Sequence, residues 1–125
     1  MKIRALDAIC IWSADPDKLA KFYEEVLGLE VASRLNLPDD TGVQFKVGNV
    51  FLFIGYHDKI SGMAKDPYRI MVGFETEHLQ PLYEELAAKD VEFIQTPVLS
   101  PDKTFYVATA LDPEGNIIQF TADEL

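Results

Sequence analysis

Residues 19–26 read Leu-Ala-Lys-Phe-Tyr-Glu-Glu-Val, and residues 79–86 read Leu-Gln-Pro-Leu-Tyr-Glu-Glu-Leu. Each copy carries apolar residues at helical spacing, which predicts an amphipathic helix. Each helix also follows one apolar, strand-like run and precedes three more. A single order of elements that occurs twice is typical of an internally duplicated fold. The sequence therefore predicts two modules, each with the order β-α-β-β-β.

The first module covers about residues 4–56, and its helix is bounded by clear signals. Asp15 is a good N-cap, Pro16 suits the first helical position, and Gly28 suits the residue after the helix. The Gly48-Asn49 pair predicts a tight hairpin turn. The predicted strands are 5–12, 29–37, 43–47 and 50–56, with residues 38–42 as a break.

Residues 57–67 are polar and lack periodicity, so we interpret them as a linker to a second module at about 68–122. Pro81 requires the second helix to begin close to it, because proline is tolerated only in a first turn. The predicted elements are a strand at 68–74, a helix at 79–88, and strands at 91–98, 104–111 and 116–121.

A four-stranded sheet under one helix buries too little apolar surface to be stable alone. We therefore expect the two modules to pair within a single domain, 1–125, of the α+β class. The expected architecture is a curved, mixed, eight-stranded sheet with the helices outside and a concave cleft inside.

The composition argues against several classes of protein. The chain has 11 Lys and Arg against 21 Asp and Glu, a formal charge of −10, whereas nucleic-acid binding needs clustered basic residues. No apolar stretch is long enough for a signal peptide or a membrane span, so we expect a cytoplasmic protein without a membrane partner. The single cysteine, Cys10, lies in an apolar run, where we expect a buried, inert thiol.

Three stretches resemble the vicinal-oxygen-chelate superfamily of glyoxalases, bleomycin-resistance proteins and dioxygenases. They are residues 6–31, which contain the string FYEEVLGLEV, residues 82–93, and residues 112–120, which read DPEGNIIQF. In the last stretch Asp112 and Pro113 set a turn, and Gly115 can take a positive φ. The resemblance implies the paired-module fold and a typical homodimer. In metal-binding members it also implies four ligands, usually His, Glu or Gln, from the first and last strand of each module.

The resemblance assigns those four ligand positions to Ala8, Phe53, Met71 and Gln119. Alanine and phenylalanine offer no donor atom, and the methionine thioether is too soft for a hard divalent ion. His57 and His78 belong to different elements and lack the spacing that puts two rings on one helix face, so we expect solvated surface histidines. We predict no metal, no other cofactor and no catalytic residue.

Side-chain alternation along the strands then predicts what faces the cleft. The predicted ligand-binding residues are Trp12, Phe51, Phe53, Arg69, Met71 and Gln119. An apolar, aromatic cleft with a few polar anchors suits a small planar ligand. The alternatives are that the aromatic residues only fill a packed core and that Arg69 lies at a solvated rim.

These observations predict a small-molecule-binding protein of the antibiotic-resistance type, which sequesters a planar or cationic ligand without chemistry. The alternative is a glyoxalase-like lyase, isomerase or dioxygenase with a divergent metal site. A third possibility is a regulatory or scaffold domain that binds no ligand.

Overall fold

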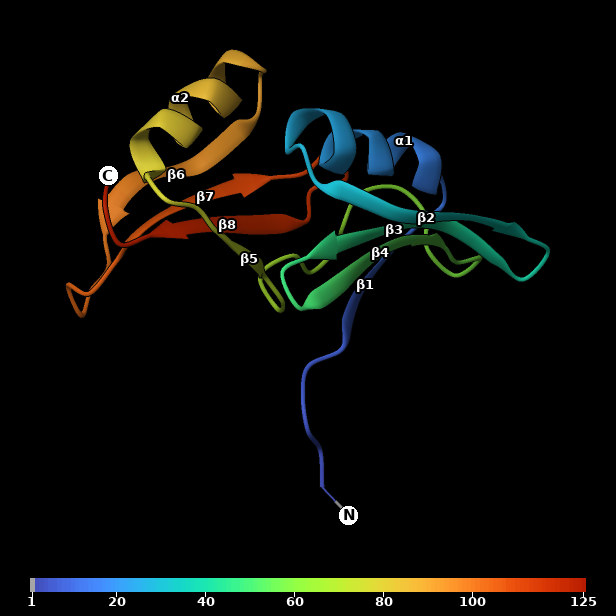
Figure 1. Cartoon of the computed structure of the whole chain (residues 1–125). Coiled ribbons are helices and arrows are strands. Elements are labelled where there is room, and N and C mark those ends of the chain that lie inside the picture. Colours follow the sequence, from blue (N-terminus) through green and yellow to red (C-terminus); the bar gives the residue numbers. More distant parts are fainter. Residues whose placement is uncertain (1) are drawn as a thin grey trace. The chain divides into compact units, whose positions relative to one another are not determined.

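The computed structural model describes residues 2–125, which form two compact units that meet in sequence between Gly62 and Met63. This boundary lies within the predicted linker. Each unit contains one β-α-β-β-β module with its own four-stranded sheet (Figure 1). The α+β class and the two modules are therefore confirmed, and the pairing of the modules around a cleft stays a prediction. No helix among residues 2–125 is long and apolar enough to cross a membrane.

The first unit builds a mixed sheet with strand order β1-β4-β3-β2. β1 runs parallel to β4, and the other neighbours are antiparallel. The helical segment covers one face of this sheet (Figure 1). The elements are β1 (Ala8–Ser13), α1 (Pro16–Lys21), η1 (Phe22–Val26), β2 (Glu30–Leu37), β3 (Asp40–Val47) and β4 (Val50–Tyr56).

The helix of the first unit begins and ends where the sequence predicts. Asp15 Oδ1 accepts a hydrogen bond from the Lys18 amide at 3.3 Å, and Pro16 is the first helical residue. Gly28 has a φ of +72°, and beyond it the Leu29 amide donates to the Tyr23 carbonyl at 3.0 Å, which satisfies a carbonyl of the last turn. The last turn, η1, is π-helical rather than α-helical, a widening that the sequence pattern does not predict.

The helix packs its apolar side on the sheet, and an ion pair connects it to β2. Leu19 and Tyr23 are almost fully buried, and the Tyr23 ring lies 6.4 Å from the ring of Phe45 on β3. Arg34 on β2 donates to both carboxylate oxygens of Glu24, at 2.8 Å and 2.6 Å. This bond, with the charge of Glu24, raises the pKa of Arg34. Because both side chains are accessible to solvent, the pair contributes little to the stability of the fold.

The second unit repeats this topology with strand order β5-β8-β7-β6. β5 runs parallel to β8, and α2 covers one face of the sheet (Figure 1). Leu79 and Leu86 of α2 and Ile118 and Phe120 of β8 are buried. The elements are β5 (Val72–Glu75), α2 (Leu79–Ala88), β6 (Glu92–Leu99), β7 (Tyr106–Leu111) and β8 (Ile117–Ala122).

Three predicted strand starts are wrong by three residues or more. β1 begins at Ala8 rather than Ala5. β3 begins at Asp40 rather than Val43, because ladder pairing with β2 continues through Thr41 to Asp40 in spite of the polar residues there. β5 begins at Val72 rather than Tyr68. The Arg69 amide donates to the Asp66 carbonyl at 3.3 Å, so a turn occupies residues 66–69, where the first part of the strand was expected.

The turn between β7 and β8 is built around the buried carboxylate of Asp112, which is 4% exposed. Its Oδ1 accepts from the amides of Glu114 at 2.9 Å and Asn116 at 3.0 Å, and its Oδ2 accepts from Asn116 Nδ2 at 2.8 Å. Gly115 has a φ of +79°, as the predicted turn requires. The family-like string at 112–116 therefore has a structural role.

We expect Asp112→Ala to lower the free energy of unfolding by at least about 2 kcal/mol, because it leaves two backbone amides in the turn without an acceptor. The exposed turn residue Asp66 provides the control, and Asp66→Ala should change stability by less than about 0.5 kcal/mol. Urea unfolding followed by circular dichroism measures both. Equal losses in the two variants would show that the Asp112 turn has no special role.

Candidate ligand-binding site

The sheet of the first unit has a second face, opposite its helix. Directly paired residues of neighbouring strands share a face. Cys10 and Gln44 both pair with Phe53, whereas the helix side of the sheet carries the buried Phe45 and Ile54. We call the opposite side the aromatic face, formed by Cys10, Trp12, Gln44, Phe51 and Phe53.

Two glycines make room for the Phe53 ring on this face. A Cβ atom built on Gly42 would overlap the Ile54 carbonyl oxygen and lie 2.8 Å from Phe53 Cζ. One built on Gly55 would overlap the Phe53 ring and lie 2.8 Å from Trp12 Cζ3. Gly42 and Gly55 are direct partners across β3 and β4. The Phe53 ring therefore lies across two adjacent strands and is only 9% exposed.

Trp12 rests on this base and remains accessible. Its ring meets Phe53 edge to face, with centroids 5.7 Å apart and an interplanar angle of 75°. His57 contacts the other side of the cluster, 5.6 Å from the Trp12 ring, and its Nδ1 accepts from the Lys59 amide at 3.1 Å. Trp12 is 39% exposed, so it presents part of a held aromatic ring to a ligand.

Gln44 is a polar group of the aromatic face that the sequence reasoning missed. Its Oε1 accepts from the Ser33 hydroxyl at 3.2 Å, and among the described residues its Nε2 has no partner. The amide N–H groups can therefore donate to a ligand acceptor beside Phe53. The signal was present in the sequence, because Gln44 is the polar member of an otherwise apolar stretch, Val43 to Phe45.

Phe51 and Phe53 differ in what they offer. Phe51 is half-buried, whereas Phe53 is covered by its neighbours. For Phe53 the structure supports the alternative of a packed side chain, because its ring fills the space above Gly42 and Gly55. Its role at the aromatic face is to support Trp12.

Cys10 also lies on the aromatic face, and the expectation of a buried thiol is wrong. The residue is exposed. It occupies β1, an edge strand, on the face that the helix does not cover. The apolar run of the sequence indicated a strand correctly, but the run does not reveal which side of the strand is covered.

The second unit carries Gln119 at the matching position of its own sheet. Gln119 pairs with Gly73 on β5, as Phe53 pairs with Cys10 on β1. Gln119 Nε2 donates to the Thr109 hydroxyl at 3.4 Å, and the side chain is half-buried. A second amide group therefore lies on the uncovered face of this sheet.

Arg69 and Met71 do not lie on a strand, which corrects their predicted placement. Arg69 Nε donates to Asp66 Oδ2 at 2.9 Å within the turn, and its side chain is 77% exposed. Met71 lies just before β5 and is 39% exposed. Strand alternation therefore gives no reason to aim either side chain at a ligand. For Arg69, the alternative of a solvated position fits the structure.

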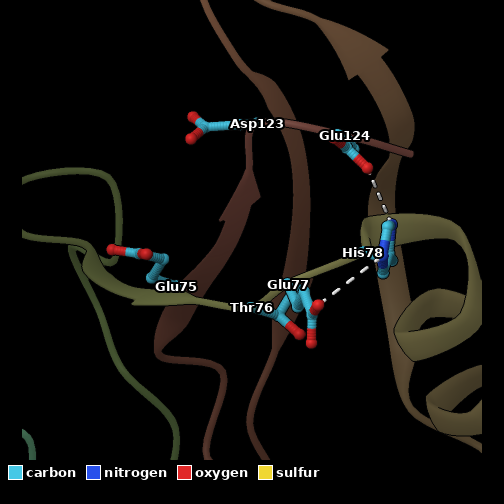
Figure 2. A pocket seen from close by; sticks show the side chains of 6 residues that line it. All are labelled: Glu75, Thr76, Glu77, His78, Asp123 and Glu124. Carbon is cyan, nitrogen blue, oxygen red and sulfur yellow. Dashed lines mark ion pairs between the residues drawn. The ribbon is translucent and has the colours of Figure 1, made fainter.

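The second unit also has an acidic depression of about 450 Å³ where β5 passes into α2. His78 Nδ1 lies 3.4 Å from Glu124 Oε2, and His78 Nε2 lies 3.9 Å from Glu77 Oε1. Figure 2 shows Glu77 and Glu124 turned toward His78, whereas Glu75 and Asp123 turn away from it. The depression is lined by Glu75, Thr76, Glu77, His78, Asp123 and Glu124.

The donor atoms available do not fit a hard divalent metal. Among residues 2–125, no three His, Cys, Asp or Glu side chains gather in a way that could hold an ion. Of the four positions that the family resemblance indicates, Phe53 contributes a packed ring and Met71 a thioether. A single neutral amide from Gln119 is too weak a ligand set for such an ion.

One further ionisable group has a shifted pKa, and its role is structural. Asp102 accepts hydrogen bonds from the Thr104 hydroxyl at 2.6 Å and the Ser100 hydroxyl at 2.7 Å. These bonds, with one from the Thr104 amide, lower the pKa of Asp102. The group stabilises the turn between β6 and β7 and does not belong to the aromatic face.

Comparison with known proteins identifies the fold. Residues 5–120 match the family described as the Glyoxalase/Bleomycin resistance protein/Dioxygenase superfamily. No protein with a curated description matches the chain. The structure of SMU.1112c is similar with a TM-score of 0.82 and 20% identity, covering 96% of this chain and 99% of that one.

Two further structures share the fold. A member of the same superfamily from Sphaerobacter thermophilus DSM 20745 has a TM-score of 0.78 and 20% identity, covering 96% of this chain and 98% of that one. A lactoylglutathione lyase from Agrobacterium tumefaciens has a TM-score of 0.72 and 21% identity, covering 98% of this chain and 96% of that one. At these identities the likeness concerns the fold alone.

We expect Gly55→Ala to destabilise the chain by about 1–3 kcal/mol, because the new methyl group displaces the Phe53 and Trp12 rings. Adding Phe53→Leu should recover part of the loss, because the two sites are in contact. Gly73→Ala is the matched control. Its Cβ would meet nothing within 4 Å, so its stability should stay within about 0.5 kcal/mol of the wild type in urea unfolding. If Gly55→Ala is as mild as the control, the Phe53 ring does not depend on the glycine pair.

Proposed function

Because the chain belongs to the Glyoxalase/Bleomycin resistance protein/Dioxygenase superfamily, we propose that it binds a small planar or cationic molecule on the aromatic face and sequesters it without metal chemistry. The observation that carries the proposal is Trp12, an exposed aromatic ring held by Phe53 on a face that the helix leaves open. An antibiotic is the ligand class that the family description favours.

The chemistry of the aromatic face supports a ligand with a flat, electron-poor ring. Stacking on a held tryptophan contributes about 0.5–1.5 kcal/mol beyond the area that it buries, and a cationic group gains further from the indole face. The formal charge of −10 favours the approach of a cation. The Gln44 amide adds one directional donor, so the ligand should carry an acceptor near its ring.

The lack of suitable donor atoms supports sequestration over catalysis. Neither Phe53 nor Ala8 can bind a metal, and His57 already uses Nδ1 to accept from Lys59. The aromatic face offers Cys10 as its only nucleophile, and no base is seen to contact the thiol among the described residues. We place the protein in the cytoplasm, where an exposed single thiol stays reduced.

A glyoxalase-like lyase is the second candidate, and one observation favours it. The chain shares its fold with a structure described as a lactoylglutathione lyase, with a TM-score of 0.72. In that case a metal would have to be held by ligands other than those at the four positions of the family pattern.

We expect a panel of planar and cationic antibiotics to include compounds that raise the thermal midpoint of the wild type. A ligand at a hundredfold excess over its Kd adds about 2.7 kcal/mol of stability. For such a compound, Trp12→Ala should weaken binding at least about tenfold, because the stacking surface is lost. Quenching of the fluorescence of Trp12, the single tryptophan, gives the wild-type Kd, and calorimetry gives that of the variant.

Tyr56→Ala is the matched control, because Tyr56 is an exposed aromatic residue whose place on β4 turns it away from the aromatic face. Its affinity should equal that of the wild type. Equal affinity of the wild type and Trp12→Ala would exclude binding on the aromatic face.

We expect protein purified without chelator to contain no stoichiometric divalent metal, and EDTA to leave ligand binding unchanged. Elemental analysis by mass spectrometry measures the first quantity and fluorescence titration the second. One tightly held ion per chain, together with a chelator-sensitive lyase activity, would instead favour the second candidate.

A further inference from the structure

Residues 2–7 form an extended arm that leaves the start of β1 and runs away from its sheet (Figure 1). The backbone hydrogen bond nearest the arm joins the Phe51 amide to the Asp7 carbonyl, at 3.1 Å. Among residues 2–125, no hydrogen bond, ion pair or ring contact involves residues 2–6. The backbone donors and acceptors of the arm are therefore available for a partner strand.

The arm exposes large apolar side chains as well as backbone. Ile3 is 93% exposed and Leu6 is 65% exposed. Both lie in the segment that continues β1, an edge strand with β4 on one side only. An extended, unpaired segment with apolar side chains is typical of a strand that pairs with another chain.

The sequence of the arm complements itself. An antiparallel pairing centred between Arg4 and Ala5 sets Lys2 opposite Asp7 and Ile3 opposite Leu6. Each opposite pair shares a face of the ribbon, so each one joins unlike charges or two apolar side chains. A two-fold axis through the centre repeats both pairs, which is the form of contact that closes a dimer.

Other arrangements lose this match. Parallel pairing in register would set Lys2 against Lys2 and Arg4 against Arg4, which is repulsive. An antiparallel shift by one residue sets either Arg4 against itself or Ile3 against Asp7. The pattern therefore favours a second copy of this chain over an unrelated partner.

We infer that residues 2–7 of two copies of this chain pair as an antiparallel ribbon, with Lys2 opposite Asp7 and Ile3 opposite Leu6, and that this contact contributes to a homodimer. The inference stands apart from ligand binding on the aromatic face.

Sedimentation equilibrium tests the role of the arm. Deleting residues 2–6 should weaken self-association at least about tenfold, because the arm supplies both apolar pairs and both ion pairs. Circular dichroism should match the wild type, since residues 2–6 lie outside the strands and make no hydrogen bond or ion pair in the part of the chain that the structure describes. A wild-type monomer, or a dimer of undiminished affinity after the deletion, would overturn the inference.

Charge exchange tests the pairing. Lys2→Glu and Asp7→Lys alone should each weaken the dimer about threefold or more, because each sets like charges opposite one another. The double variant should regain the wild-type affinity. Lys65→Glu, at an exposed site outside the arm, controls for the change in net charge and should leave the affinity unchanged. A double variant weaker than both single variants would contradict the pairing.

Disulfide trapping tests the register, in a Cys10→Ser background that removes the exposed native thiol. A mixture of Ile3→Cys and Leu6→Cys chains should give a crosslinked heterodimer under mild oxidation. Direct cross-strand Cα atoms are about 4.5–5.5 Å apart, within disulfide range. Ile3→Cys alone should not crosslink, because the two sites would be about 10 Å apart along the ribbon. A crosslink in the single variant but not in the mixture would overturn the antiparallel pairing.

Discussion

A single short helix can cover only one face of a four-stranded sheet, and the rest of each unit depends on that constraint. In the first unit the covered face carries Phe45 and Ile54, which are fully buried, and the Tyr23 ring of the helix lies close to the Phe45 ring. The strand period of two then sends the alternate residues to the other face, where no helix protects them. Each module therefore has one sheet face that its helix leaves uncovered. The side chains on that face decide what it can bind.

On the uncovered face of the first unit, the side chains are mostly packed aromatic rings and offer few donor atoms for a metal. Gly42 and Gly55 have no Cβ atom, and the Phe53 ring lies in the space that such atoms would need. That arrangement supports Trp12. Under the predicted assignment of metal-ligand positions, the Phe53 ring would stand where a donor atom is expected, which is how the packing of this face and the proposed binding without a metal are connected. In the second unit the matching position keeps a polar group, Gln119.

The sequence was most informative where local physical signals act. Asp15, Gly28 and the turn at Asp112 behave as their residue types predict, because capping and turn chemistry depend on near neighbours. The sequence was least informative where contacts between residues far apart in the chain decide where a strand begins or which face a side chain occupies. β3 runs on through Asp40 because β2 pairs with it. Arg69 lies outside the strand because its amide donates to the Asp66 carbonyl in a turn. Gln44 was missed because its place beside Phe53 follows from the strand register.

The structure defines the offset between the two modules more clearly than the similar sequence strings do. The similar strings begin at Leu19 and Leu79, but the helices begin at Pro16 and Leu79, 63 positions apart. Cys10 and Gly73, which pair with Phe53 and Gln119, have the same separation. The resemblance of the strings is therefore displaced by about one helical turn from the true correspondence, which preserves the apolar stripe of the helix.

The most direct measurement of the central claim is a heteronuclear NMR titration of the protein in EDTA with the tightest ligand from the screen. Binding on the aromatic face predicts that the NMR signals of the Trp12 indole N–H and the Gln44 side-chain amide shift together. Both shifts should reach a plateau when one ligand is bound per chain. Shifts confined to the residues of the acidic depression, or binding that occurs only after a divalent metal replaces EDTA, would contradict it.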